Sequence, residues 1–203
     1  MLDLHILKTS ELERFRGERS HEAVIVMPAV KMAQAKALAG VLIARAKHPG
    51  LLVIAEDDSK LGFIATANAV YARTDSRFFA YIAQDAFPGK HWLDFAVRIM
   101  QSTGAGLLAF NDGKWFGGVA SFGMAERSFT NSLYGNLLFY PQYMSHCADV
   151  ELSTLARNAD KLAYHADCIM LEVDYTRHLR PPQNTPDDTL FHRRRQAGFP
   201  LLV

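Results

Sequence analysis

Two short apolar runs early in the chain have the length of buried strands, and a helix-like segment separates them. The first run covers residues 23–27 (AVIVM) and stops at Pro28. Residues 31–50 are rich in Ala, Leu and Lys and end in Pro-Gly, which is typical of a helix and its stop signal. The second run, residues 51–55 (LLVIA), follows directly. A strand, a helix and a strand within about thirty residues predict a βαβ unit and a parallel sheet with covered faces.

The rest of the chain continues the alternation and then changes character. Residues 106–110 (GLLAF) and 114–120 (KWFGGVA) read as two strands joined by a turn, so antiparallel pairing enters the sheet there. The pattern also predicts three further helices, at 63–74, 88–102 and 149–160, and two further strands, at 78–82 and 162–173. We therefore expect one domain over residues 1–180, followed by a Pro-rich, basic tail or lid over 181–203.

Composition narrows the possible partners. The 203 residues are 49% hydrophobic, and 22 Lys and Arg balance 21 Asp and Glu, so no overall field draws the protein to nucleic acid or membrane. Two cysteines are too few for a disulfide framework, and the first twenty residues lack the apolar core of a signal peptide. No apolar run approaches the ~20 residues of a membrane span. These features favour a cytoplasmic protein without a membrane span.

Acidic residues follow two of the expected parallel strands. Glu56, Asp57 and Asp58 come directly after the second strand, and Asp85 follows the strand at 78–82. Ligands of open α/β sheets bind beside the carboxyl ends of the strands, so these carboxylates are candidates for one ligand-binding crevice. The alternative for each residue alone is ordinary turn chemistry or a solvated loop.

These segments, in this order, resemble the GT-A-fold, family-2-like nucleotide-sugar glycosyltransferases. The resemblance covers roughly residues 23–178 and rests on five stretches: PAV, LLVIAEDDSK, LGFIATANAV, YIAQDAFPGKHWLD and ADVELSTLARNADKLAYHADCIMLEVDYTRH. It implies an α/β fold class with a single Rossmann-like GT-A domain, in which helices flank a mixed, mostly parallel sheet. It also implies a nucleotide-diphosphate sugar, such as a UDP-sugar, as the donor substrate.

The resemblance assigns residues to the donor. It places Pro28, Glu56 and Asp57 at the nucleoside and Asn68 beside the nucleotide pocket. Where the family has an Asp-x-Asp motif that binds a divalent metal, this chain keeps only the second acid, Asp85.

The metal site therefore departs from the family pattern. The first acid of the motif is replaced by Ala83, and a late His that completes the site in some relatives matches His178. One carboxylate can still bind Mn²⁺ or Mg²⁺, because these ions accept water and substrate phosphates as their other ligands. A surface role for His178 is the alternative.

The expected catalytic base lies near residue 149. In inverting relatives a Glu-Asp pair opens a late helix, and this chain has Ala148-Asp149 there. An inverting transfer needs a carboxylate that takes the proton of the acceptor hydroxyl, which makes Asp149 the candidate base. Asp is also a common helix N-cap, and the two roles are compatible.

Other functions compete with this one. Ala83 and Ala148, at two family-acid positions, would suit a catalytically inactive nucleotide-sugar-binding module. A sugar nucleotidyltransferase would need a Gly-rich, basic loop after the first strand, and MPAVKMAQAKA lacks one. A zinc site is a further option, built from His146, Cys147, His165 and Cys168, against the alternative of core thiols.

The acceptor is open at this stage. A saccharide, a lipid-linked glycan, a protein and a hydroxymethylated base of viral DNA all offer a suitable hydroxyl. The basic run HRRR at 192–195 either folds back onto an anionic ligand or forms a solvated tail.

Overall fold

A mixed, mostly parallel sheet organises the protein, and the predicted α/β fold class is confirmed. The computed structural model describes residues 1–17, 20–173 and 185–202. Within them the strand order is β1-β3-β2-β4-β7-β6-β8-β5, with β7 antiparallel to both its neighbours and β5 antiparallel to β8. The bounds are β1 Leu2–Lys8, β2 His21–Ala29, β3 Gly50–Glu56, β4 Ser76–Tyr81, β5 Ala86–Pro88, β6 Leu107–Asn111, β7 Gly123–Glu126 and β8 Leu162–Glu172.

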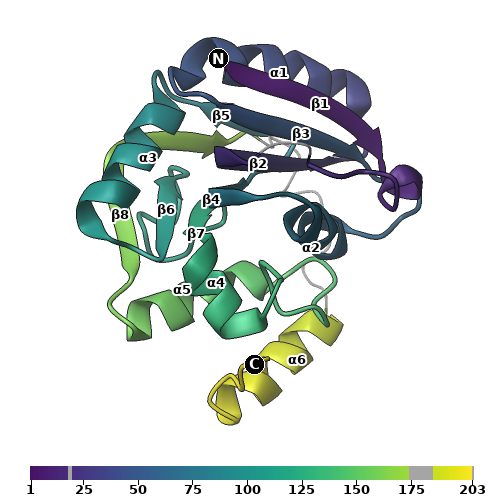
Figure 1. Cartoon of the computed structure of the whole chain (residues 1–203). Helices are drawn as coiled ribbons and strands as arrows, with labels where there is room; N and C mark the ends of the chain where they lie inside the picture. Colours follow the sequence, from purple (N-terminus) through teal and green to yellow (C-terminus); the bar gives the residue numbers. More distant parts are fainter. Residues whose placement is uncertain (18–19, 174–184, 203) are drawn as a thin grey trace.

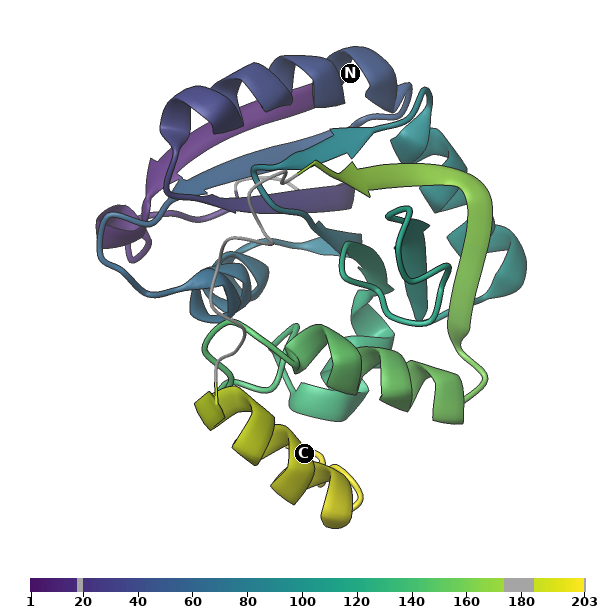
Figure 2. The same ribbon diagram turned by 180° about the vertical axis from the view of Figure 1, so that it is seen from behind.

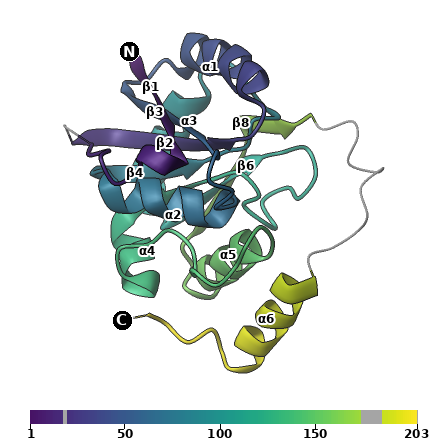
Figure 3. The same cartoon turned by 90° about the vertical axis from the view of Figure 1, so that its right-hand side faces the viewer.

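Helices cover both faces of the sheet and give three layers (Figures 1 and 2). Helices α1 (Met32–Ala46) and α3 (Trp92–Thr103) pack on one face with a core that includes Ile25, Leu52 and Phe78. The opposite face carries α2 (Phe63–Arg73), α4 (Arg127–Tyr134) and α5 (Ala148–Asn158). Helix α6 (Thr185–Gln196) lies outside the α4 and α5 layer (Figure 3).

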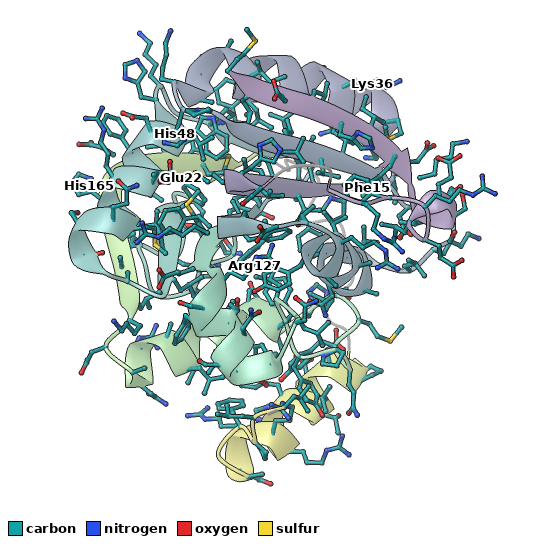
Figure 4. All side chains as sticks on the ribbon, viewed as in Figure 1. Phe15, Glu22, Lys36, His48, Arg127 and His165 are labelled. Atoms are coloured by element: carbon teal, nitrogen blue, oxygen red, sulfur yellow. The ribbon has the colours of Figure 1, made fainter. Side chains whose placement is uncertain are left out.

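Arg127 at the start of α4 joins that layer to the sheet (Figure 4). Its guanidinium donates hydrogen bonds to the carbonyl oxygens of Ser76 and Tyr71, both at 3.0 Å, and lies 3.9 Å above the Tyr71 ring. Charge-assisted bonds to backbone carbonyls fix the position of α4 against β4 and α2. Arg127 therefore ties the start of α4 to the first residue of β4 and to the last turn of α2.

Strand β1 was missing from the predicted elements. It pairs in parallel with β3 from Leu2 to Lys8 and forms one edge of the sheet. Leu2 and Leu7 are buried whereas residues 3–6 are exposed. An edge strand of this kind has no continuous apolar run, so the hydrophobic pattern does not predict it.

The predicted end of strand β2 is wrong. Strand β2 does not stop at Pro28 but continues to Ala29, paired with β3. Pairing between β2 and β4 ends at Val26, and the N–H of Ile82 donates to the Val26 carbonyl. The backbone groups of alternate residues face the same neighbouring strand, so Pro28 faces the β4 side, like Val26. Because β4 has already ended there, no strand needs a hydrogen bond from position 28, and the missing N–H of proline costs nothing.

The expected strand at 114–120 is a loop instead. Residues 112–122 connect β6 to β7, and the antiparallel partner of β6 is β7 itself. Phe116 and Gly117 have positive φ values of 46° and 81°, which a strand does not accept. The antiparallel pairing was predicted correctly, but it uses residues further along the chain.

Candidate functional site

A cavity of about 620 Å³ lies between the sheet and the α2 and α5 side of the molecule. That volume falls in the range of ligand pockets. Aromatic and aliphatic side chains share the wall with a few polar ones, an arrangement typical of small-molecule sites. The lining residues are Phe63, Ile64, Tyr81, Ala83, Trp115, Val119, Ser121, Phe122, Phe139, Ser145, His146, Cys147, Asp149, Val150, Glu172 and Asp188.

Asp149 reaches this cavity from the first turn of α5. The helix N-cap is Cys147, in left-handed conformation with φ 64°, so Asp149 is not the cap residue. It is half-buried, and its Oδ1 accepts a hydrogen bond of 2.9 Å from the N–H of Val150. A carboxylate in this place is suited to take a proton from a hydroxyl group in the cavity.

The cavity wall behind Asp149 is rigid. The Tyr81 hydroxyl donates to the carbonyl of Ala120 (2.7 Å), and the Ala120 N–H donates to Oγ of Ser153 on α5 (2.9 Å). Ser153 in turn donates to the carbonyl of Asp149 (2.6 Å). Burial and, to a smaller extent, the charge of Asp149 raise the pKa of Tyr81 well above its ordinary value. The neutral phenol therefore stays a hydrogen-bond donor that ties β4 to the 112–122 loop.

The loop that contains Trp115 has its own anchor. Asp112 is 5% exposed and accepts the N–H groups of Lys114 and Trp115 on one oxygen and the Ser121 hydroxyl on the other. Trp115 keeps 46% of its surface exposed while it lines the cavity. A fixed loop thus presents an open aromatic face at the rim.

The acids after β3 have other partners. Both carboxylate oxygens of Asp57 accept backbone N–H groups, from Leu61 at 2.7 Å and Gly62 at 2.8 Å. Asp58 accepts the backbone N–H and the hydroxyl of Ser10, and these bonds lower its pKa to about 2. Asp57 and Glu56 are not among the cavity-lining residues, although the loop that Asp57 holds leads directly to Phe63 in the wall.

The 83–85 segment reaches the cavity through Ala83. Gln84 Oε1 accepts the N–H groups of Val30 and Lys31 just beyond β2, both at 2.9 Å, so the ends of β2 and β4 meet here. The Asp85 carbonyl accepts the N–H of Val173 at 3.0 Å, next to the cavity residue Glu172. Asp85 itself is not among the cavity-lining residues; it lies two residues from Ala83, its carbonyl contacts the residue after Glu172, and its side chain is half-buried.

Asn68 is placed differently from the other candidates. Its side-chain oxygen accepts the N–H groups of Leu138 and Phe139, and its amide donates to the Phe139 carbonyl at 3.0 Å. It is 5% exposed and does not line the cavity. Asn68 holds the 138–139 segment, of which Phe139 lines the cavity. Pro28 is buried in β2 outside the lining set, and His178 falls outside the described residues.

Two acidic residues that line the cavity were not predicted from the sequence. Glu172 ends β8, and Asp188 comes from the carboxyl-terminal helix α6. Glu172 follows the same strand-end rule that indicated Asp85, so its signal was present. Asp188 has no local signal, because only the packing of α6 brings it to the cavity.

Among the described residues there is no group of three or more His, Cys, Asp and Glu side chains that could hold a metal ion. His146, Cys147, His165 and Cys168, all described, therefore do not form a zinc site. Cys168 is fully buried in β8, as the core-thiol alternative expects, whereas Cys147 lines the cavity. No helix in the part of the chain that the structure describes has the length and apolar character needed to cross a membrane.

The arrangement of sheet and helices bears out the GT-A-like fold that the sequence predicts. One solved structure with this fold is the mannosyltransferase PcManGT from Pyrobaculum calidifontis, in complex with GDP-Man and Mn²⁺. The two chains share 9% identity, with a TM-score of 0.59 over 87% of this chain and 70% of that one. No protein-family model and no curated protein sequence matches the chain.

Proposed function

We propose that this protein is a glycosyltransferase that moves a sugar from a nucleotide-diphosphate sugar to a hydroxyl acceptor with inversion, using Asp149 as the base. The observation that carries the proposal is the position of Asp149 in the wall of a cavity of about 620 Å³, within a GT-A-like fold. The solved neighbour, which binds GDP-Man and Mn²⁺, supports a donor of this class.

The proposed reaction moves one proton to Asp149 and one electron pair to the leaving diphosphate. Asp149 takes the proton of the acceptor hydroxyl as that oxygen bonds to the anomeric carbon of the sugar. The bond from the anomeric carbon to the diphosphate oxygen breaks, and its electron pair leaves with the nucleoside diphosphate. Attack opposite the leaving group inverts the anomeric centre.

The donor is proposed to extend from Asp149 toward the ends of β2, β3 and β4. Glu56 and Asp57 are the candidate nucleoside contacts, with Pro28 and Asn68 supporting that side of the pocket. The 57–62 loop connects these residues to the cavity wall. Gly62 packs closely against the residue before Ser145, since a Cβ placed on Gly62 would lie 3.1 Å from the carbonyl oxygen of Met144. The strand-end acids and the cavity are thus one loop apart.

A divalent cation fits this donor set only with help from the substrate. Asp85, together with His178, would hold Mn²⁺ or Mg²⁺, and phosphate oxygens and water would complete the ligands. The ion would supply positive charge against the leaving diphosphate. A site with one carboxylate should bind metal weakly without nucleotide, so metal and nucleotide binding should be coupled.

The first experiment is a thermal-shift screen with UDP, GDP and CDP, each with and without Mn²⁺, followed by assays of nucleotide release from the matching sugar nucleotides. The proposal expects stabilisation by one nucleotide that grows with Mn²⁺ and shrinks in Asp85→Ala. Nucleotide release should follow in the presence of a saccharide acceptor. Stabilisation without release under any acceptor would favour the inactive binding module instead, and no stabilisation by any nucleotide would contradict both.

A further inference from the structure

Helix α6 contributes two adjacent carboxylates to the neighbourhood of the cavity, and they face different partners. Asp187 is 1% exposed and accepts the backbone N–H groups of Met144, Ser145 and His146 at 2.9, 2.8 and 2.7 Å. Asp188 lines the cavity and accepts a hydrogen bond from the Cys147 thiol at 3.4 Å. Together they hold every residue from 144 to 147.

That segment leads directly into the catalytic end of α5. Ser145, His146 and Cys147 line the cavity, and Cys147 is the N-cap of the helix whose second residue is Asp149. Three N–H groups converging on one ionised carboxylate form strong, directional bonds. Asp187, which lies in the carboxyl-terminal helix α6, therefore sets the conformation of the segment before Asp149.

Helix α6 is itself fixed by a buried ion pair. Arg194 donates to both oxygens of Glu151 at 2.8 Å, and its guanidinium lies 3.4 Å over the Tyr140 ring. Tyr134 and Tyr143 also donate to Glu151, at 2.8 and 2.7 Å. Since Glu151 is two residues beyond Asp149 on α5, the same helix is tied to α6 at both its first turn and its approach segment.

We infer that α6 takes part in the function of the cavity through two residues. Asp187 is a positioning residue for Asp149, and the carboxylate of Asp188 accepts hydrogen bonds from the hydroxyl groups of bound sugar. This inference rests on the proposed function for its kinetic part. Its structural part, the bracing of residues 144–147 by Asp187, stands on the contacts alone. Helix α6 then belongs to the catalytic site, and Arg194 of the HRRR run is turned inward to Glu151 and not to a ligand.

Cys147 provides a test that does not depend on activity. Burial, and then the hydrogen bond and charge of Asp188, raise the pKa of its thiol to about 12, so it should react slowly with iodoacetamide. Cys168 is fully buried and reports global opening in the same sample. Asp187→Asn keeps the side-chain shape but replaces an acceptor with an amide N–H₂ group, and it should speed Cys147 labelling by about tenfold or more. Asp167→Asn, on an exposed Asp of β8, is the matched control and should leave the rate unchanged.

Steady-state kinetics separate the two acids. Asp187→Asn should lower kcat with little change in KM, because donor contacts survive while the base is displaced, and Asp188→Asn should raise KM more than it lowers kcat. Asp187→Glu, measured beside Asp187→Asn with melting curves for both, keeps the test usable if one variant folds poorly. Unchanged Cys147 labelling in a folded Asp187 variant would overturn the bracing, and wild-type KM in Asp188→Asn would overturn the sugar contact. Failure of wild-type protein to turn over any donor would instead count against the proposed function, while the labelling result would still decide the role of Asp187.

Discussion

Two groups of acids in this molecule look alike in sequence and differ in use. The carboxylates of Asp57 and Asp58, after β3, accept hydrogen bonds from backbone and hydroxyl groups of their own loop and of the segment after β1. Asp149 and Glu172 line the cavity, as does Asp188 from α6. A carboxylate at a strand end can thus hold the loop that shapes a pocket without lining the cavity itself. The carboxylates that line the cavity come from a helix start, a late strand end and the carboxyl-terminal helix.

The largest expected effect is a loss of turnover when a carboxylate that lines the cavity is changed. Asp149→Asn removes the proposed base and should lower turnover by about 10²- to 10⁴-fold, the usual contribution of general-base catalysis. Nucleotide binding, followed by thermal shift, should persist because the amide fills the same space. Turnover equal to wild type would show that another group takes the proton, with Glu172 the next carboxylate to test.

The next effect concerns Glu151, two residues further along α5, which lies in the core instead of the cavity. Arg194→Ala should lower the free energy of unfolding by about 3–5 kcal/mol, because it leaves the Glu151 charge buried without its cation. Burial alone would lower the pKa of the Arg194 guanidinium, but the hydrogen bonds and charge of Glu151 outweigh it and hold that pKa above its ordinary value. Urea unfolding measures the loss.

Arg195→Ala is the matched control, since the neighbouring side chain is exposed. It should change stability by less than about 0.5 kcal/mol. Equal losses in the two variants would mean that the Glu151–Arg194 pair does not hold α6.

A smaller effect is expected at Asn68, which separates a structural contact from a ligand contact. Asn68→Ala leaves the N–H groups of Leu138 and Phe139 without an acceptor and should cost about 1–3 kcal/mol of stability. Thermal and urea unfolding would show it in the absence of nucleotide. A variant with wild-type stability and weakened nucleotide binding would instead place Asn68 at the ligand.

The smallest effect is a change in pH dependence at the loop after β3. The pKa of Asp58 is lowered from 3.8 to about 2 by its bonds to Ser10, so the ionised form is the one that the fold favours. The resulting stabilisation is present above pH 4 and is lost as pH falls through about 2. Asp58→Asn should flatten the fall of Tm between pH 4 and 2, and Tm curves parallel to wild type in that window would contradict the assignment.

Much of the fold could be predicted from sequence because its central strands are buried on both faces. The runs at 23–27 and 51–55 are continuous apolar stretches, and they form the interior strands β2 and β3. Edge strand β1 and the 112–122 loop were mispredicted, since the first has exposed polar positions and the second combines aromatic residues with positive φ. Periodicity reports burial well and turn geometry poorly.

The roles of the candidate site residues stay predictions, and the sequence pointed to only some of the residues around the cavity. A local motif pointed to Asp149, which lines the cavity, whereas Glu56, Asp57, Asn68 and Asp85 do not line it. Asp188 could not be found this way, because its place depends on α6 returning across α5 through Arg194. Long-range packing of a polar, charged segment leaves no periodic signal in the chain.

The central claim is that the donor occupies the cavity beside Asp149. The most direct measurement is a crystal structure of the protein with the nucleotide selected by thermal shift, its sugar derivative and Mn²⁺. The account predicts density with the anomeric carbon facing Asp149, the diphosphate near Asp85 and the nucleoside toward Glu56 and Asp57. A nucleotide bound elsewhere, with this cavity holding only water, would contradict it.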